Sequence, residues 1–372
     1  GALQVQGGRI VSVGETTAEN VQRVDMSGRL LCPMFINAHT HVADTGAKEL
    51  GVGLPLEQVV NPPDGLKHRF LQSVKGSEEH IAMMRHGLRE MLSNGIIAAA
   101  DFREQGLAGV RALRQATQGL PVQVVVLGRM AEGAGQAEVE REAHAILQEA
   151  DGLGVRDVEA YDPALLKRLR EAYPHKLLAA HAAEDEASEA LSRSQTGMGQ
   201  AGRLLEWQPD FLVHLTHTSG AELDRMVELG IPGVACPRSN GILGDGLPRL
   251  AEWAKRGLHF GLGTDNVMFT APDMLREMDY ASRLVRGLER NPAVVEPRLF
   301  LKAATIEGAR ILHLDRDLGS LAPGKRACFI VVNLDTENLT YQKDAISAVV
   351  HRVTLADIAG IYIDGSLFLV PS

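Results

Sequence analysis

The stretch Leu30–His41, with the sequence LLCPMFINAHTH, is an apolar run that ends in two histidines separated by one residue. In a β-strand, side chains two residues apart point to the same face, so a strand here places His39 and His41 side by side at its carboxyl end. Imidazole is a good ligand for zinc and for iron. The stretch predicts a metal site at the mouth of a sheet or barrel, although the two histidines by themselves are also compatible with an ordinary polar loop.

Downstream of this strand, short apolar segments alternate with amphipathic helical stretches. One helix is expected over Glu78–Ser93, whose apolar residues recur at helical spacing, and another begins at the capping box Ser219–Glu222. Strands that alternate with helices are typical of βαβ units and a parallel sheet. Eight such units fit a TIM barrel, written (β/α)8, better than an open sheet. The seven further strands are expected at 96–100, 122–127, 152–155, 176–180, 211–213, 232–235 and 259–262.

Both ends of the chain are predicted to be β-structure. Leu3–Gln6 and Arg9–Val13 flank a Gly-Gly turn signal, and Asp364-Gly365 is a hairpin turn signal near the carboxyl end. The simplest arrangement pairs the late strands with the early ones. We therefore expect an α/β fold with two domains: a small composite β-sandwich of residues 1–32 and 316–372, and a metal-dependent TIM-barrel hydrolase domain of residues 33–315.

Composition and charge exclude several classes of protein. The 372 residues have a formal net charge of −9 and scattered basic residues, so a nucleic-acid partner is not expected. The chain has no apolar run of roughly 18 residues and its first residues lack the pattern of a signal peptide, so a membrane partner is not expected either. The three cysteines lie far apart without a Cys-x-x-Cys pair, which disfavours a thiolate zinc site and favours a cytoplasmic location.

Residue types that bind metals follow four of the predicted strands. Because barrel active sites are built at the carboxyl ends of the strands, we expect these side chains to converge. Three or four protein ligands plus a water are typical of a catalytic metal site, and the metal lowers the pKa of that water to about 7. The candidate ligands are His39, His41, His181 and Asp265.

Two further residues are candidates for the chemistry itself. Glu184, three residues after His181, is a carboxylate that would transfer protons. His214, at the end of the sixth strand, would hydrogen-bond the water or the developing oxyanion. Each residue alone has an ordinary structural interpretation, such as a buried histidine or a solvated carboxylate. Their coincidence at separate strand ends favours the metal site.

These segments resemble the amidohydrolase superfamily, and most closely its mononuclear deaminase branch, which contains cytosine and guanine deaminases, S-adenosylhomocysteine deaminase and triazine chlorohydrolases. The resemblance covers essentially the whole chain. It implies a TIM barrel with one divalent metal, zinc in preference to iron, held by the four candidate ligands. The matching segments are 33–41, 181–184, His214 with its following helix, 236–240, 262–266, 304–309 and 318–325.

The resemblance implies hydrolytic deamination of an aminated heterocycle, such as a purine, pyrimidine, pterin or nucleoside, by metal-activated water. Glu184 would protonate the ring nitrogen, His214 would polarise the water, and Asp265 would also accept a proton from it. Binuclear members use a carboxylated lysine at the end of the fourth strand, and residues 152–161 contain no lysine, which favours a single metal. Hydrolysis of a cyclic amide and chlorohydrolase-type displacement are alternatives at the same site, and a non-catalytic binding or scaffold barrel is a remote one.

The sequence gives weaker signals for substrate binding. Arg103 and Arg129 follow the second and third strands, where a guanidinium would grip a carboxylate or phosphate. Lys48 and Asn240 lie in loops after the first and seventh strands. For each residue, an ion pair, a solvated position or a loop-ordering contact is the competing interpretation. The segment 42–77 is a candidate lid, and a homo-oligomer is compatible with the short chain because a second subunit would then complete the pocket around a small heterocyclic substrate.

Overall fold

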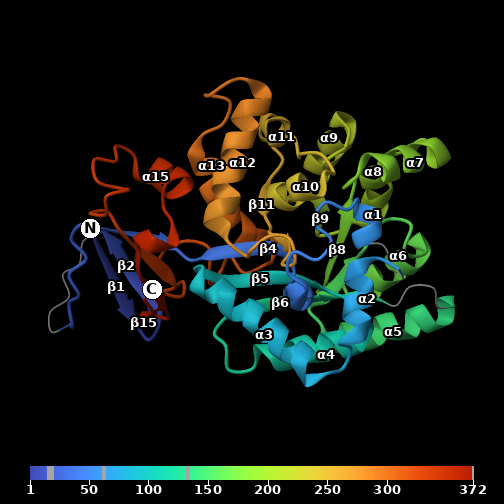
Figure 1. The fold of residues 1–372 in the computed structure, drawn as a ribbon, viewed down its shortest axis with the longest axis horizontal. Helices are drawn as coiled ribbons and strands as arrows, with labels where there is room; N and C mark the ends of the chain where they lie inside the picture. The colour runs from blue at the N-terminus through green and yellow to red at the C-terminus, as the bar shows by residue number, and fades with distance from the viewer. Residues whose placement is uncertain (15–20, 61–63, 131–134, 371–372) are drawn as a thin grey trace.

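The computed structural model of the chain describes residues 1–14, 21–60, 64–130 and 135–370. Its centre is a curled parallel sheet with helices on both sides of it (Figure 1). The mixed α/β class and the parallel sheet predicted from the sequence are confirmed, and the arrangement is consistent with a TIM barrel. The order of the strands across the sheet is β11 (Phe260–Leu262), β10 (Gly233–Ala235), β9 (Phe211–His214), β8 (Leu177–Ala182), β7 (Gly152–Val155), β6 (Gln123–Gly128), β5 (Ile96–Arg103), β4 (Phe35–His41) and β12 (Asp265–Asn266).

The two outermost strands of this sheet, β11 and β12, are neighbours in the chain. Only Gly263 and Thr264 separate them, yet β11 pairs with β10 and β12 pairs with β4. A Cβ atom at Gly263 would lie 2.9 Å from the backbone nitrogen and oxygen of His39. Glycine is therefore required at this break, because any side chain would collide with the strand that supplies the first two histidines.

Burial explains why these segments form strands. All seven residues of β4 and all eight of β5 are buried. Strands covered on both faces are composed of nearly continuous apolar or small residues, as β5 illustrates with the sequence IIAAADFR. Polar side chains are placed at the carboxyl ends, where the sheet is no longer covered by helices.

Helices follow the strands and begin where the sequence predicts capping. Asp162 accepts a hydrogen bond from the backbone nitrogen of Ala164, and Ser219 and Glu222 form the expected capping box. The helices are α1 (Leu56–Val59), α2 (Leu66–Ser73), α3 (Glu78–Ser93), α4 (Gly106–Thr117), α5 (Gln136–Glu149), α6 (Pro163–Ala172), α7 (Glu186–Thr196), α8 (Gln200–Leu204), α9 (Gly220–Leu229), α10 (Pro237–Leu243), α11 (Leu250–Arg256), α12 (Met274–Glu289), α13 (Pro297–Lys302), α14 (Gly308–Ile311) and α15 (Ala345–His351), with shorter helical turns at η1 (Val42–Ala47), η2 (Leu205–Trp207), η3 (Ala303–Glu307) and η4 (Leu355–Asp357).

Strands from the two ends of the chain lie together beside the barrel (Figure 1). β1 (Ala2–Gln6) and β2 (Arg9–Gly14) form the expected hairpin. A separate antiparallel sheet has the order β15, β14, β13, β3, and Asp364 and Gly365 make the predicted turn between two of its strands with φ values of +50° and +77°. The bounds of these four strands are β3 (Arg29–Pro33), β13 (Phe329–Asn333), β14 (Ile358–Ile363) and β15 (Ser366–Leu369).

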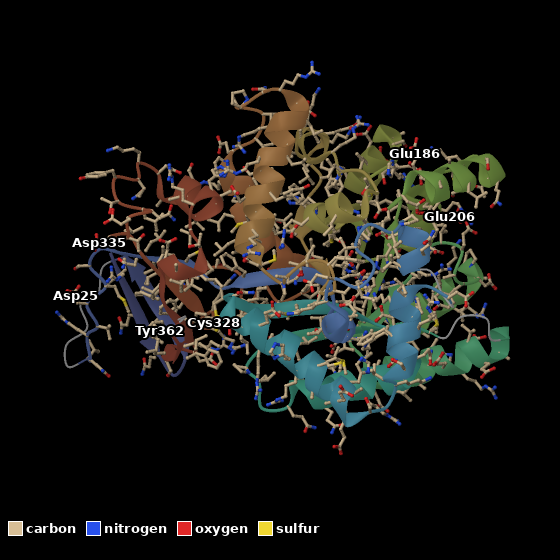
Figure 2. The ribbon with its side chains drawn as sticks, in the orientation of Figure 1. Asp25, Glu186, Glu206, Cys328, Asp335 and Tyr362 are labelled. Atoms are coloured by element: carbon tan, nitrogen blue, oxygen red, sulfur yellow. The ribbon has the colours of Figure 1, made fainter. Side chains whose placement is uncertain are left out.

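Packing in the terminal strands joins residues from opposite ends of the chain. Cys32 on β3 lies opposite Ile330 on β13. The ring of Phe329 stacks on that of Tyr362, with centroids 4.9 Å apart, and Figure 2 shows Tyr362 and Cys328 among these strands. A small apolar cluster also unites Ile10 of the hairpin with Phe329.

The apolar run that precedes the two histidines is divided between two sheets. β3 ends at Pro33 and β4 begins at Phe35. The backbone nitrogen of Met34 donates to Cys328 in the terminal sheet, whereas that of Phe35 donates to Gly95 beside the barrel. Met34 therefore marks the position at which the chain crosses from one sheet to the other.

Among the described residues, no helix is both long enough and apolar enough to cross a membrane.

Candidate metal and catalytic site

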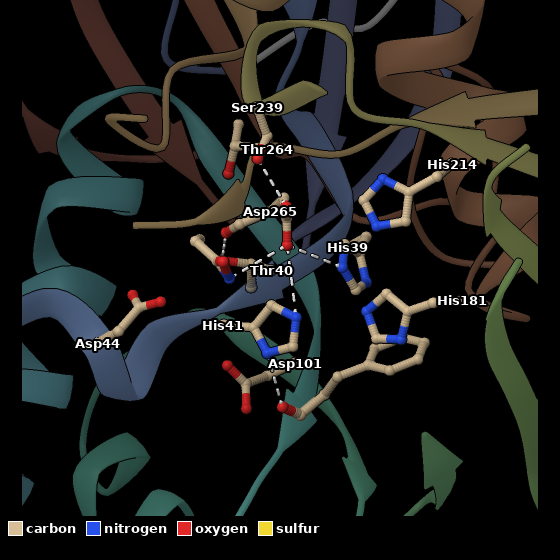
Figure 3. Close-up of polar contacts among 12 residues, drawn as sticks. His39, Thr40, His41, Asp44, Asp101, His181, His214, Ser239, Thr264 and Asp265 are labelled. Carbon is tan, nitrogen blue, oxygen red and sulfur yellow. Dashed lines mark hydrogen bonds and ion pairs between the residues drawn. The ribbon is translucent and has the colours of Figure 1, made fainter. Parts of the chain in front are cut away.

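The carboxyl end of β4 places two buried imidazoles next to a carboxylate. His39 is fully buried and His41 is 3% exposed. In the parallel register of β4 and β12, Asp265 lies beside Thr40, between the two histidines. Its Oδ1 atom is 3.2 Å from His39 Nε2 and 3.4 Å from His41 Nε2 (Figure 3). The alternation of a β-strand thus delivers both rings to one oxygen, as the sequence predicts.

Two more imidazoles complete the cluster from β8 and β9. The ring of His181 stacks between its neighbours, with its centroid 5.5 Å from that of His41 and 5.3 Å from that of His214. Nitrogen and oxygen atoms of two overlapping groups lie within 4.8 Å of one another. These groups are His39, His41, His181 and His39, His214, Asp265. The structure therefore brings together every metal-ligand candidate predicted from the sequence.

Backbone carbonyl groups orient two of these rings. His41 Nδ1 lies 3.1 Å from the carbonyl oxygen of Phe102, and His181 Nδ1 lies 3.1 Å from that of Val155. A carbonyl only accepts, so the proton of each neutral ring is on Nδ1 and the lone pair is on Nε2. Outer contacts of this kind fix the tautomer of metal-binding histidines, and here they direct both Nε2 lone pairs to the cluster.

The donor set fits a divalent metal. Nitrogen and oxygen donors of this kind suit zinc and other first-row divalent ions. His39 Nδ1 and His214 Nε2 are buried without a hydrogen-bond partner in the structure. A buried polar atom without a partner is unfavourable, and both atoms belong to rings of the cluster. Both the chemistry and the unmet hydrogen-bonding capacity are those of a metal site.

Electrostatics keeps the cluster in the protonation state that a metal needs. Burial lowers the pKa of His39 and His214, lowers that of His181 well below its usual value, and lowers that of His41 to about 3. Burial alone would raise the pKa of Asp265, but the His39 hydrogen bond and the nearby imidazoles hold it well below its usual value. Neutral imidazoles and an ionised carboxylate are competent ligands.

Glu184 has the opposite protonation behaviour. It lies in the turn between β8 and α7, with Oε2 3.5 Å from His214 Nε2. Burial, together with the negative charge of Asp265, raises the pKa of Glu184 well above its usual value. Two carboxyl groups in one site thus have pKa values that are pushed apart, a pattern that separates a proton donor from a ligand.

Contacts outside the cluster hold His214 and Asp265 in place. Ser239 donates a hydrogen bond of 2.6 Å to Asp265 Oδ2, which leaves Oδ1 directed at the imidazoles. The side-chain amide of Asn240 lies 3.2 Å from His214 Nδ1. His214 and Asp265 both have positive φ values, +72° and +57°. Such strain in non-glycine residues is retained where the surrounding structure enforces it, commonly at active sites.

The cluster opens into a polar cavity of about 130 Å³. From the described part of the segment 42–77, the apolar side chains of Leu56 and Val60 and the side chain of Lys67 line it. The remaining lining residues are His41, Arg129, Arg156, Asp157, His181, Ala182, Glu184, Asp185, Ser188, Gln200, His214, Asp265 and Asn266. Apart from the histidines, no aromatic residue is among these lining residues.

One of the four proposed substrate contacts, Arg129, lines the cavity. The other three do not. Arg103 is 1% exposed and forms ion pairs with Asp101 and Glu104, which is the competing interpretation of its position. Lys48 pairs with Glu90 at the surface, and Asn240 contacts His214 instead of the cavity.

Sequence reasoning missed two charged residues beside the cluster. Glu104 Oε1 lies 2.8 Å from His41 Nδ1, and Lys67 Nζ lies 2.7 Å from the same oxygen. Glu104 directly follows β5, the second strand of the barrel. Its place at a strand end is the same feature that pointed to the candidate metal ligands. Lys67 had no such signal, because it lies in a long connection and reaches the site only through the tertiary fold.

Comparison with known proteins agrees with this geometry. A putative aminohydrolase of Methanothermobacter thermautotrophicus is 36% identical over 297 residues, which cover 77% of this chain and 76% of that protein. A 5-methylthioadenosine/S-adenosylhomocysteine deaminase of Symbiobacterium thermophilum is 24% identical over 99% of this chain and 88% of its own. The crystal structure of an adenosine deaminase from Xanthomonas campestris with bound zinc superposes with a TM-score of 0.86 at 22% identity, covering 99% of this chain and 88% of that one. The model of the amidohydrolase family matches residues 30–366, and the chain therefore belongs to the amidohydrolase family.

Proposed function

We propose that the protein is a metal-dependent hydrolytic deaminase that releases ammonia from an aminated heterocycle. The observation that supports this most strongly is the convergence of three imidazoles and one ionised carboxylate beside Glu184, whose pKa is raised well above its usual value. Relatives over nearly the whole chain are named as deaminases. Hydrolytic deamination requires ligands for one metal and, next to them, a carboxylic acid that donates a proton.

In this proposal His39, His41, His181 and Asp265 would hold one divalent ion, zinc. Bound there, the ion would supply Lewis-acid chemistry that lowers the pKa of a water to about 7. Zinc is also the metal in the crystal structure of the similar adenosine deaminase. The segment 152–161 has no lysine from which a second metal site would be built.

Three side chains move or hold protons around the reacting carbon. Glu184, whose pKa is raised well above its usual value, donates its proton to the ring nitrogen next to the carbon under attack. His214 hydrogen-bonds through Nε2 and stabilises charge that develops on the incoming oxygen. Asp265 accepts one proton of the attacking water and passes it to the exocyclic nitrogen. The bond from carbon to that nitrogen then breaks, ammonia leaves, and the second proton of the water returns to Glu184 as the lactam forms.

The cavity of about 130 Å³ supports a compact polar ring as the part of the substrate that reaches the cluster, and Leu56 and Val60 line it with apolar side chains. Arg129 is our candidate for a direct substrate contact, through hydrogen bonds from its guanidinium group. The segment 42–77 acts as a lid that excludes water from the reaction.

The domain organisation that we propose assigns residues 1–32 and 316–372 to one small β-sandwich and residues 33–315 to the barrel. The pairing of β3 with β13 and the apolar cluster around Ile10 support it. We place the protein in the reducing cytoplasm because its three cysteines, Cys32, Cys236 and Cys328, are buried free thiols. The partner is a small molecule, and self-association into a homo-oligomer is compatible with this assignment.

Ammonia release measures this function directly. The zinc-loaded protein is incubated with a panel of aminated purines, pyrimidines, pterins and nucleosides, and ammonia is quantified together with the ring product. Deamination predicts equal amounts of ammonia and lactam from at least one member of the panel. Ring opening or chloride release without ammonia would instead support the two alternative hydrolytic reactions at the same site.

A further inference from the structure

A buried network of charged residues lies next to the metal cluster, on the side of the lid. Its members are at most 4% exposed. Two are cations and three are carboxylates, and they come from η1, α2 and the end of β5. They are Asp44, Lys67, Asp101, Arg103 and Glu104.

Two of these five belong to the segment 42–77, Asp44 on η1 at its start and Lys67 on α2. Lys67 also lines the cavity. Its ammonium nitrogen is 2.7 Å from Glu104 Oε1 and 3.8 Å from Asp44 Oδ2. Glu104 follows β5 and Asp44 follows β4, so one ammonium group joins α2 to two strand ends of the barrel.

Both contacts of Lys67 continue directly to the metal cluster. The Glu104 oxygen that contacts Lys67 is also 2.8 Å from His41 Nδ1. Asp44 Oδ1 accepts a hydrogen bond of 3.1 Å from the backbone nitrogen of Met268, three residues after Asp265. The ammonium group of Lys67 is thus linked through Glu104 to His41, and through Asp44 to the backbone three residues after Asp265.

The other cation of the network, Arg103, is paired with carboxylates at the end of β5. Arg103 pairs with Glu104 and, at 3.1 Å, with Asp101. Asp101 Oδ2 in turn accepts a hydrogen bond of 2.6 Å from the backbone nitrogen of Val42. Arg103 thus ties Glu104 to the end of β5, whereas Lys67 ties the same carboxylate to α2.

We propose that Lys67 is a positioning residue that couples closure of α2 over the cavity to retention of the metal through Glu104 and His41. With Lys67 in place, the Glu104 carboxylate is held at His41 Nδ1 and keeps Nε2 directed at the cluster. Without it, Glu104 turns toward other donors and His41 loses a constraint. The coupling is reciprocal, so a bound metal also favours the closed position of α2. This inference rests on the proposed metal-dependent function.

The test compares Lys67→Met with Lys48→Met. Both variants remove one ammonium group from the segment 42–77, but Lys48 pairs only with Glu90 at the surface. Zinc release to a chromogenic chelator and hydrogen exchange of the backbone amides of α2 are measured on the zinc-loaded protein. Lys67→Met is expected to release zinc at least tenfold faster and to exchange faster in α2, because loss of an outer contact typically weakens metal binding 10- to 100-fold. Lys48→Met is expected to match the wild type within about twofold.

Glu104→Gln tests whether the coupling passes through Glu104. If it does, the double variant Lys67→Met/Glu104→Gln releases zinc no faster than the faster single variant, whereas independent effects would multiply. If Lys67→Met alone does not fold, the double variant replaces it in the test, because Glu104→Gln removes the carboxylate that would otherwise be left without the ammonium group of Lys67. It is then expected to fold and to release zinc at least tenfold faster than the wild type.

Two results would overturn the inference: zinc release within twofold of the wild type in a folded variant that lacks Lys67, or effects of the two substitutions that multiply. A merely structural role predicts a lower melting temperature of the metal-free protein with unchanged zinc release. Failure of the proposed function has a different signature, because the wild type itself would then bind no stoichiometric zinc.

Discussion

Glu184→Gln separates proton transfer from metal binding. The substitution keeps the size of the side chain and removes the acidic proton. A positioned general acid contributes about 10²- to 10⁴-fold to a rate, which corresponds to about 2.7–5.4 kcal/mol of transition-state stabilisation. Burial and the negative charge of Asp265 raise the pKa of Glu184 well above its usual value, which favours the protonated form that a general acid requires.

The assay is steady-state ammonia release by zinc-loaded wild type and variant at pH 7, with zinc content determined on the same samples. The expected result is a kcat lowered by at least 10²-fold with one zinc per chain in both proteins, since Glu184 is not in the groups of atoms that lie within 4.8 Å of one another. A variant that keeps more than a tenth of the wild-type kcat would refute the proton-donor role. A variant that loses its zinc would make Glu184 a ligand.

Three further outcomes are expected. His181→Ala removes an imidazole whose Nε2 lone pair is directed at the cluster, and zinc titration should show at least 10²-fold weaker binding together with loss of ammonia release. Ser239→Ala removes the 2.6 Å hydrogen bond to Asp265 Oδ2, so zinc affinity should fall about 10-fold in the same titration while the protein remains folded. Burial raises the pKa of Glu277, on α12, to about 7 in the folded state, whereas its usual value of 4.5 applies to the unfolded chain. Between pH 4.5 and 7 the folded protein therefore binds a proton that the unfolded chain has released. Stability should therefore fall as the pH rises from 4.5 to 7, by at most about 3 kcal/mol, and denaturant unfolding of Glu277→Gln should lack this part of the pH dependence.

The convergence of the candidate metal ligands could be predicted because it depends on local rules. His39 and His41 share a face of β4 through the alternation of a strand, and His181 and Asp265 lie at strand ends that any parallel barrel brings together. The hairpin turn at Asp364-Gly365 and the capping box at Ser219 are equally local. In each case a few neighbouring residues determine the geometry, and the sequence displays them directly.

The surroundings of the ligands could not be predicted in the same way. Arg103 follows a strand just as the ligands do, but its guanidinium turns back to Asp101 and Glu104 and is buried away from the cavity. Which way a long side chain turns depends on the charges around it, and these come from other parts of the chain. Lys67 shows the same limit, since its position depends on how the segment 42–77 folds over the barrel.

The division of the apolar run at Met34 also depends on tertiary structure. Leu30–Ile36 is uniformly apolar, and hydrophobicity alone gives no reason to end one strand at Pro33 and begin another at Phe35. The two strands differ only in their partners, Cys328 for Met34 and Gly95 for Phe35. Both partners lie at least 60 residues away along the chain.

Titration of zinc into the metal-free protein, followed by ammonia release from a substrate identified in the panel, tests the central claim most directly. The account predicts no ammonia without metal and a linear rise that reaches its plateau at one equivalent of zinc per chain. A plateau at two equivalents would contradict the single metal held by His39, His41, His181 and Asp265. Full ammonia release from the metal-free protein would contradict the metal-dependent reaction itself.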